Sequence, residues 1–87
     1  MYDILWTETA KKKLSKLDKS TMRRIIKAVG KLKKAPEKFG KHLLYRPFWS
    51  LRVGKYRVIY SIERSQVKIV AIGLRDSIYK SEALKEC

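Results

Sequence analysis

The stretch SLRVGKYRVIYSI, residues 50–62, alternates apolar and polar side chains on both sides of a glycine. Gly54 followed by Lys55 suits a two-residue turn of type II′, in which the first turn residue takes a positive φ. The stretch therefore predicts a β-hairpin whose register is fixed by its turn. In that register Arg52 stands opposite Arg57. Two like charges in this position weaken a hairpin unless an anion or a carboxylate lies between them.

The two faces of this hairpin differ in character. One face is continuous and apolar, carrying Trp49, Leu51, Val53, Tyr56, Val58, Tyr60 and Ile62. A second turn near Arg64 and Ser65 sets Ile62 against Val67, which extends the apolar face through Ile69 and Ala71. We expect helices to cover this side. The other side, called here the arginine face, is predicted to hold Arg52, Arg57, Phe48, Ser50, Ile59, Ser61, Lys68, Val70 and Ile72.

The rest of the chain predicts an α+β fold in a single domain, residues 1–87. A short strand in residues 2–7 ends at Thr7, which is a suitable N-cap for a first helix. A second helix follows, and its apolar spacing stops at Pro36. Three antiparallel strands then form a meander: residues 42–45 continuing into 48–53, residues 56–63, and residues 66–73. Asp76 caps a short C-terminal helix. The two-helix hairpin packs on one face of the sheet.

The charge of the chain is strongly positive, with a formal net charge of +14. Residues 9–57 hold 17 of the 22 basic residues and only two acidic ones, Asp18 and Glu37. Such a surface attracts phosphates or an acidic protein. Apolar runs are too short for a membrane span, the N-terminal segment does not resemble an export signal, and Cys87 is the single cysteine. We therefore expect a soluble cytoplasmic protein that does not contact a membrane.

Two observations qualify the arginine pair. Glu63 lies on the same face and is a candidate internal partner for the two charges. Arg75, at the end of the last predicted strand, is placed to join Arg52 and Arg57, while Tyr79 falls in the first turn of the C-terminal helix. The face is then either a binding surface for an anion or a surface neutralised from within.

The segments LRVGKYRVIYSI and GLRDSIY, in this order of elements, resemble the RelE branch of the RelE/ParE superfamily of toxin-antitoxin toxins. The resemblance covers nearly the whole chain. It implies a small basic toxin that enters the ribosomal A site and cleaves the messenger RNA there, inhibiting translation until an acidic, RelB-like antitoxin neutralises it. It implies no metal and no cofactor. In the family, the 2′-hydroxyl attacks the adjacent phosphate.

The resemblance also implies roles for individual residues. Arg57 matches an arginine that stabilises the phosphate in the transition state, Arg75 one that protonates or stabilises the leaving 5′-oxygen, and Tyr79 a tyrosine that orients the nucleotide. Arg52 and Lys55 would contact the RNA backbone.

The chain departs from the family at two positions. Phe48 and Ser50 stand where well-known members carry lysines that supply a general base, so the base is unassigned here. Phe48 could stack on a nucleotide, and Ser50 would lie beside the RNA. His42 is a candidate for acid-base work, because histidine side chains commonly serve this role, although a lone histidine is more often structural.

Other functions stay open at this point. A ParE-like toxin that inhibits DNA gyrase needs no RNA-cleaving side chains. A non-catalytic module that binds ribosomes or RNA needs only the cations. A general ribonuclease fits less well, because the sequence offers no evident His/Glu acid-base pair.

Overall fold

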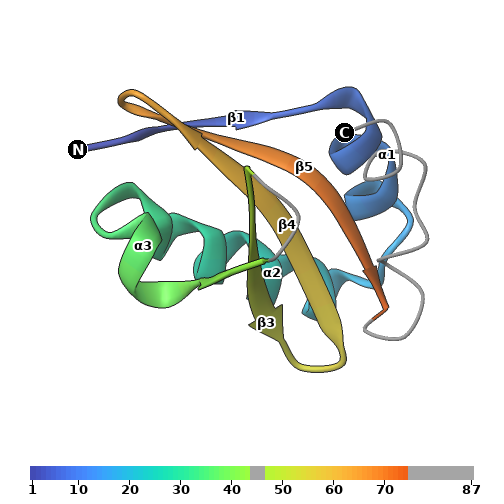
Figure 1. Ribbon diagram of the computed structural model, residues 1–87. Coiled ribbons are helices and arrows are strands. Elements are labelled where there is room, and N and C mark those ends of the chain that lie inside the picture. Colours follow the sequence, from blue (N-terminus) through green and yellow to red (C-terminus); the bar gives the residue numbers. More distant parts are fainter. Residues whose placement is uncertain (44–46, 75–87) are drawn as a thin grey trace.

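A five-stranded mixed sheet with helices packed against one face forms the part of the chain that the structure describes. The structure is a computed structural model, and it describes residues 1–43 and 47–74. The strands follow the spatial order β1-β5-β4-β3-β2, in which β1 runs parallel to β5 and every other pair is antiparallel (Figure 1). This arrangement confirms the predicted α+β fold. The elements are β1 (Asp3–Trp6), α1 (Glu8–Ser15), α2 (Lys19–Gly30), a 3₁₀ turn η1 (Lys31–Lys33), α3 (Pro36–Phe39), β2 (Lys41–His42), β3 (Phe48–Val53), β4 (Tyr56–Glu63) and β5 (Gln66–Leu74).

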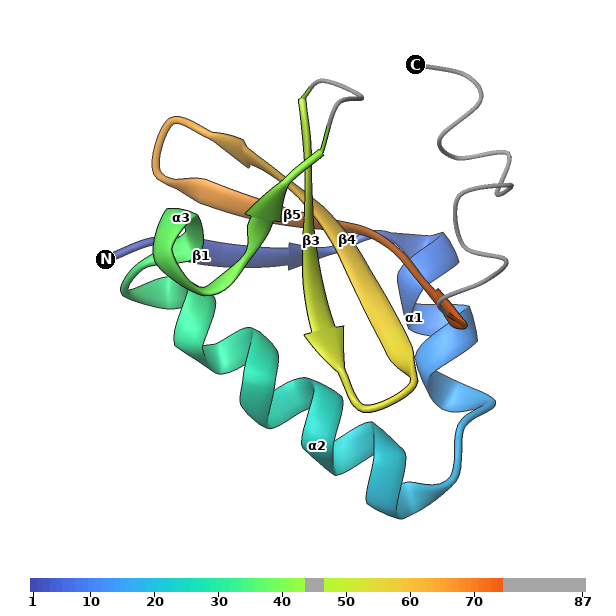
Figure 2. The same ribbon diagram turned by 60° about the horizontal axis from the view of Figure 1, so that its bottom comes forward.

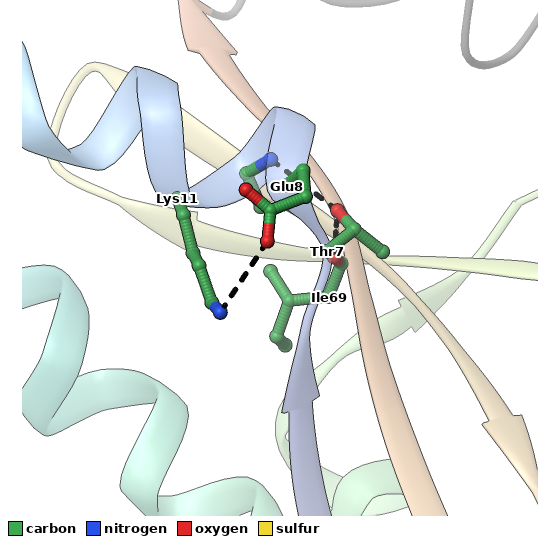
Figure 3. A network of polar contacts seen from close by, with 5 residues as sticks. Thr7, Glu8, Lys11 and Ile69 are labelled. Atoms are coloured by element: carbon green, nitrogen blue, oxygen red, sulfur yellow. Dashed lines mark hydrogen bonds and ion pairs between the residues drawn. The ribbon is translucent and has the colours of Figure 1, made fainter.

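Thr7 joins the first strand, the first helix and the last strand (Figure 3). Its side-chain oxygen accepts a hydrogen bond from the Ala10 backbone N–H at 3.3 Å, so Thr7 caps α1 as predicted. The same hydroxyl donates to the Ile69 carbonyl of β5 at 2.7 Å. The ion pair between Glu8 and Lys11 nearby, at 3.6 Å, is exposed and contributes little to stability. Thr7 therefore fixes where α1 leaves the sheet.

The second helix is shorter than the apolar spacing suggested. Asp18 caps its N-terminus by accepting a hydrogen bond from the Thr21 N–H at 3.1 Å, and α2 ends at Gly30. Leu32, predicted to lie on this helix, is carried instead by η1 and is fully buried. Pro36 then begins α3, where its missing N–H costs no hydrogen bond. The chain thus turns toward the sheet edge through two short helical segments that the sequence pattern did not separate.

The register of the central hairpin is the predicted one. Leu51 pairs with Val58, and Arg52 pairs with Arg57. Gly54 has a φ of 61°, and Lys55 is not in the positive-φ region, as a type II′ turn requires. The second turn, at Arg64 and Ser65, also forms, with Ile62 paired to Val67. The face that carries Leu51 and Val58 is the one that α1 and α2 cover (Figure 2). Its buried cluster consists of Ala10, Ile25, Val29, Leu32, Leu51, Val58, Tyr60, Val67, Ile69 and Ile72.

A β-bulge in β5 corrects the predicted faces at the end of that strand. Tyr60 pairs with Ile69, but its neighbour Ile59 pairs with Ala71, which leaves Val70 as an extra residue. One extra residue exchanges the two faces beyond it, because side chains alternate along a strand. Ile72 therefore joins the helix-covered core, and Ala71 lies on the arginine face. Strict alternation along the strand predicts the opposite placement, with Ala71 in the core and Ile72 on the arginine face.

The predicted first strand of the meander is two strands. β2 and β3 pair with each other, with Lys41 opposite Ser50 and His42 opposite Trp49. Pro47 precedes β3, and its lack of an N–H is a physical reason for one strand to end before the next begins. The fold therefore has a short edge strand, β2, separate from β3, where the sequence predicts one strand continuing into the next.

Two further findings concern the predicted C-terminal helix and the absence of a membrane-spanning helix from the described residues. The C-terminal helix predicted to follow Asp76 lies outside the described residues. None of the helices in residues 1–43 and 47–74 is long and apolar enough to span a membrane.

Tyr60 ties the sheet to the segment that leads into β2. It is fully buried, and its hydroxyl donates a hydrogen bond to the Pro36 carbonyl at 2.6 Å. Burial raises the pKa of Tyr60 to about 12, because the phenolate would lose its hydration in the core. Gly40 lies against the same hydroxyl, and a Cβ at position 40 would overlap it. Gly40 is therefore required by the close approach of the Tyr60 side chain.

We expect Gly40→Ala to lower the free energy of unfolding by about 2–4 kcal/mol, because the methyl group must displace Tyr60 and break its hydrogen bond. Denaturant unfolding measures the change. Gly30→Ala is the matched control, since Gly30 has helical dihedral angles and open space around its Cβ position. Gly30→Ala should raise the free energy of unfolding by roughly 0.5–1 kcal/mol. Equal effects of the two substitutions would contradict this account of Gly40.

Candidate functional site

Two arginines stand side by side on the face of the central hairpin that is turned away from α1 and α2. Arg52 of β3 and Arg57 of β4 are directly opposite each other, next to the turn. Arg52 is exposed and Arg57 is half-buried. On its other side, Arg57 pairs with Gly73 of β5, which has no side chain to occupy the space beside it. The pair therefore forms a concentrated positive charge at one end of the sheet.

Arg57 is held in place from within the face. Its Nη1 donates a hydrogen bond to Ser50 Oγ at 3.1 Å, and Ser50 is itself buried. The Arg57 Nε is also buried, and within the described part of the chain it has no hydrogen-bond partner. A buried donor without a partner is costly, because water no longer satisfies it. Arg57 is thus oriented by Ser50, while its buried Nε stays without a partner among residues 1–43 and 47–74.

A carboxylate does not neutralise the pair within residues 1–43 and 47–74. The only ion pair there joins Glu8 and Lys11 on α1. Glu63, considered above as an internal partner, lies at the far end of β4, where it is exposed and pairs with Gln66. Among these residues, the positive charge of Arg52 and Arg57 is left for a ligand or a partner to balance.

The middle of the arginine face is a small apolar cluster. Phe48, Ile59 and Ala71 are buried there, with Leu43 and Val70 packed against them. Phe48 is only 3% exposed, so its ring packs in this cluster rather than standing free for a nucleotide to stack on. The cluster provides a rigid support beneath Ser50 and therefore beneath Arg57.

The structure adds a cation that sequence reasoning missed. Lys41 of β2 stands opposite Ser50, so it lies on the arginine face, and it is exposed. Pro47 interrupts the predicted strand, and this interruption is the sequence signal that would have placed Lys41 on a separate strand beside β3. His42 is on the other face, because it pairs with Trp49, and the two rings lie 4.7 Å apart. This position removes His42 from the chemistry of Arg52 and Arg57.

The remaining predicted site residues are placed only in part. Lys55 is exposed at the tip of the hairpin, with its Nζ 5.9 Å from the centre of the Tyr56 ring. Arg75 and Tyr79 lie outside the described residues. Arg75 follows Leu74, the last residue of β5, and Gly73 of that strand is the neighbour of Arg57.

The chemistry open to this site is that of fixed positive charge. Guanidinium groups match the oxygens of phosphates and carboxylates in pairs of hydrogen bonds. In residues 1–43 and 47–74 no group of three His, Cys, Asp or Glu side chains is arranged to hold a metal ion. The described residues therefore form a candidate site for an anion, with two arginines opposite each other on neighbouring strands.

Comparison with known proteins gives the family. Residues 4–79 match the family model described as ParE toxin of type II toxin-antitoxin system, parDE. This match spans most of the chain, so the protein belongs to that family. It is a toxin of a type II toxin-antitoxin system, and the resemblance to the RelE/ParE superfamily is confirmed. No curated protein sequence gives a significant match.

Solved structures agree with this assignment. The toxin-antitoxin complex RelBE2 from Mycobacterium tuberculosis is similar at 29% identity and a TM-score of 0.77, covering 85% of this chain and 91% of that one. The archaeal RelE-RelB complex from Pyrococcus horikoshii is similar at 28% identity and a TM-score of 0.70, covering 85% and 94%. A mutant of the E. coli toxin RelE in the free state shares the fold at 23% identity and a TM-score of 0.80, covering 98% and 96%.

The role of Ser50 in holding Arg57 is open to measurement. Ser50→Ala should lower the free energy of unfolding by about 1–3 kcal/mol, because a partly buried guanidinium loses its acceptor. Ser15→Ala is the control, since Ser15 also makes one hydrogen bond, to the Lys12 carbonyl, but on an exposed helix surface. Its effect should stay within about 0.5 kcal/mol. The same measurement is repeated in an Arg57→Ala background. If Ser50→Ala lowers the free energy of unfolding equally in both backgrounds, the hydrogen bond between Arg57 and Ser50 is not the cause of the loss.

Proposed function

We propose that this toxin is a ribosome-dependent endoribonuclease that cleaves messenger RNA in the ribosomal A site and so inhibits translation in the cytoplasm. The observation that carries the proposal is the pair formed by Arg52 and Arg57, which no carboxylate neutralises in the described residues. An inhibitor that only occupies a protein surface has no need for such a pair with one member held by a buried serine. A phosphodiester in a transition state gains charge at the point where two guanidinium groups can meet it.

The proposed mechanism divides the work among a few side chains. The ribose 2′-hydroxyl attacks the adjacent phosphate, and the negative charge that develops on the phosphate oxygens is stabilised by Arg57. Arg52 and Lys55 hold the RNA backbone, and Ser50 keeps the Arg57 guanidinium in its orientation. Arg75 protonates the leaving 5′-oxygen or stabilises its negative charge as the P–O5′ bond breaks, and Tyr79 orients the nucleotide. Phe48 supports this arrangement from the cluster beneath it.

The group that accepts the 2′-hydroxyl proton is a separate question. Phe48 and Ser50 have no basic side chain, and His42 faces the opposite side of the sheet. Lys41 lies opposite Ser50 on the arginine face, so it is the one described amine of β2 that borders the site. We place it beside the substrate as an RNA-binding cation and as the first residue to replace in a search for the base.

The second part of the proposal is an acidic antitoxin of the RelB type. The complexes from Mycobacterium tuberculosis and Pyrococcus horikoshii each join a toxin to its antitoxin. With a net charge of +14, this chain attracts an acidic protein over a long distance, and the uncompensated arginines offer partners for its carboxylates. Binding of the antitoxin at this face would block the RNA site directly.

A specific observation also favours a second function. The matching family model is named for ParE, so inhibition of DNA gyrase is the alternative. Such an activity requires a protein-binding surface and no group that stabilises a phosphate in a transition state. Supercoiling assays with purified gyrase therefore separate the two functions.

Primer extension on programmed ribosomes tests the main proposal. Wild-type protein should produce messenger ends confined to the A-site codon, and Arg57→Ala should slow this cleavage by about 100-fold or more, because it removes a donor to the transition state. Arg75→Ala is expected to have an effect of similar size. Arg64→Gly is the control: it removes one positive charge at the far end of β4, and glycine suits the φ of 55° there. It should cleave at the wild-type rate.

Two results would count against this assignment. Cleavage by Arg57→Ala at the rate of the parent would mean that the arginine pair is not the catalytic site. Intact messenger together with blocked supercoiling would replace the proposal by gyrase inhibition.

A further inference from the structure

A second positively charged site lies on the other side of the same hairpin tip. A pocket of about 280 Å³ opens between α2 and the β3–β4 turn, and its lining residues are Thr21, Arg24, Val53, Gly54, Lys55 and Tyr56. The turn of this hairpin lies close above the first half of α2 in Figure 2. The pocket is therefore formed by two elements that are far apart in the sequence.

Two cations line this pocket, and each comes from a different element. A side chain at Gly54 would place its Cβ 3.6 Å from Arg24 Nη2, which shows how closely the guanidinium lies over the turn. Lys55 is exposed at the turn itself. Neither cation forms an ion pair with a carboxylate in residues 1–43 and 47–74. Like charges that converge without a counter-charge indicate a site for an anion.

The acidic residue at the start of α2 is already engaged. Asp18 caps α2, where it accepts hydrogen bonds from the Thr21 N–H at 3.1 Å and from the Thr21 hydroxyl at 2.6 Å. Asp18 is not among the residues that line the pocket. Thr21 lines the pocket, but its hydroxyl donates its hydrogen bond to Asp18. Thr21 therefore offers no donor to a ligand. Binding of an anion therefore depends on Arg24 and Lys55.

The position of the pocket relates it to the arginine pair. Arg52 and Arg57 flank the same turn on the arginine face, and Val53 and Tyr56, directly beside them in sequence, face the pocket. Cations therefore lie on both sides of the hairpin tip: Arg52 and Arg57 on the arginine face, Arg24 of α2 on the pocket side, and Lys55 in the turn. A flexible polyanion that passes around the tip meets both positive sites, whereas a folded anion of similar size meets one.

We propose that this pocket binds one backbone phosphate of the single-stranded RNA, while Arg52 and Arg57 hold another phosphate of the same strand. This inference rests on the proposed function, because it names a second contact for the same substrate. The pocket is small, and its apolar wall consists of Val53 and Tyr56, which are only half-buried. A protein segment needs apolar anchors in a binding pocket, whereas a phosphate needs the two cations that are present.

The test uses a single-stranded 2′-O-methyl RNA of about ten nucleotides, which binds but has no 2′-hydroxyl to attack the phosphate. Its affinity for the full chain is measured across a range of salt concentrations. Arg24→Gln should weaken binding severalfold. It should also make the negative slope of log K against log salt shallower by about 0.7, the value for one phosphate contact on a single strand. Glutamine keeps much of the arginine stem over Gly54, and thermal unfolding confirms that the variant is folded.

Arg23→Gln is the matched control. Arg23 is the adjacent residue of α2, is exposed, carries the same charge and does not line the pocket. Its removal should change the slope by less than half as much. Equal effects at positions 23 and 24 would overturn the proposal, because they would reflect the general positive field of the protein. Lys55→Gln combined with Arg24→Gln should lower affinity by less than the product of the single effects, since both contact one phosphate.

Further arms separate this site from its alternatives. A polyglutamate peptide is titrated in parallel, and a dependence on Arg24 that appears with the peptide and not with the RNA would overturn the proposal in favour of an acidic protein. Cleavage on ribosomes is measured with the same variants. If wild-type protein cleaves but Arg24→Gln behaves as Arg23→Gln does, the pocket assignment fails while the proposed function stands. If RNA binding depends on Arg24 but no cleavage occurs, the pocket stands and the proposed function fails.

Discussion

The turn at Gly54 and Lys55 determines which residues of β3 and β4 stand opposite one another, and this register determines the face on which each side chain lies. With the turn in place, Leu51 and Val58 enter the core beneath the helices, and Arg52 and Arg57 meet on the other face. A shift of one residue would bury both arginines and expose the core. The same register that stabilises the fold thus creates a repulsion of about 0.2–1 kcal/mol between the two guanidinium groups.

The fold accommodates this repulsion because each face of the sheet has its own support. The helices and the Tyr60 hydrogen bond hold one side, while the cluster around Phe48 and Ile59 holds the other and keeps Ser50 beneath Arg57. Arg57 is therefore oriented by its hydrogen bond to Ser50 before any ligand binds, and such preorganisation is what electrostatic stabilisation of a transition state requires. The positive charge spread over the rest of the chain attracts anions over a long distance, and the arginine pair offers them a specific position to bind.

Much of this organisation is readable from the sequence, since it follows from local rules. Gly54 specified the turn, the alternation beyond it specified the two faces, and Thr7 specified the start of α1. The bulge at Val70 left no such mark, because no glycine or proline accompanies it, and Ala71 and Ile72 were consequently exchanged. The parallel pairing of β1 with β5 joins two strands that lie far apart in the sequence, and no local pattern encodes it. The place of Lys41 on the arginine face was not predicted, because it depends on β2 being separate from β3. Pro47 is the sequence signal for that separation.

The central claim is that Arg52 and Arg57 form an anion site whose repulsion is relieved by a bound phosphate. A double-mutant cycle with Arg52→Ala and Arg57→Ala measures their coupling directly, and it excludes contributions from phosphate bound elsewhere on the protein. The free energy of unfolding is measured in chloride and in phosphate at equal, low ionic strength. The account predicts an unfavourable coupling of about 0.2–1 kcal/mol in chloride that vanishes or changes sign in phosphate. A coupling that is zero, or one that is the same in both salts, would contradict it.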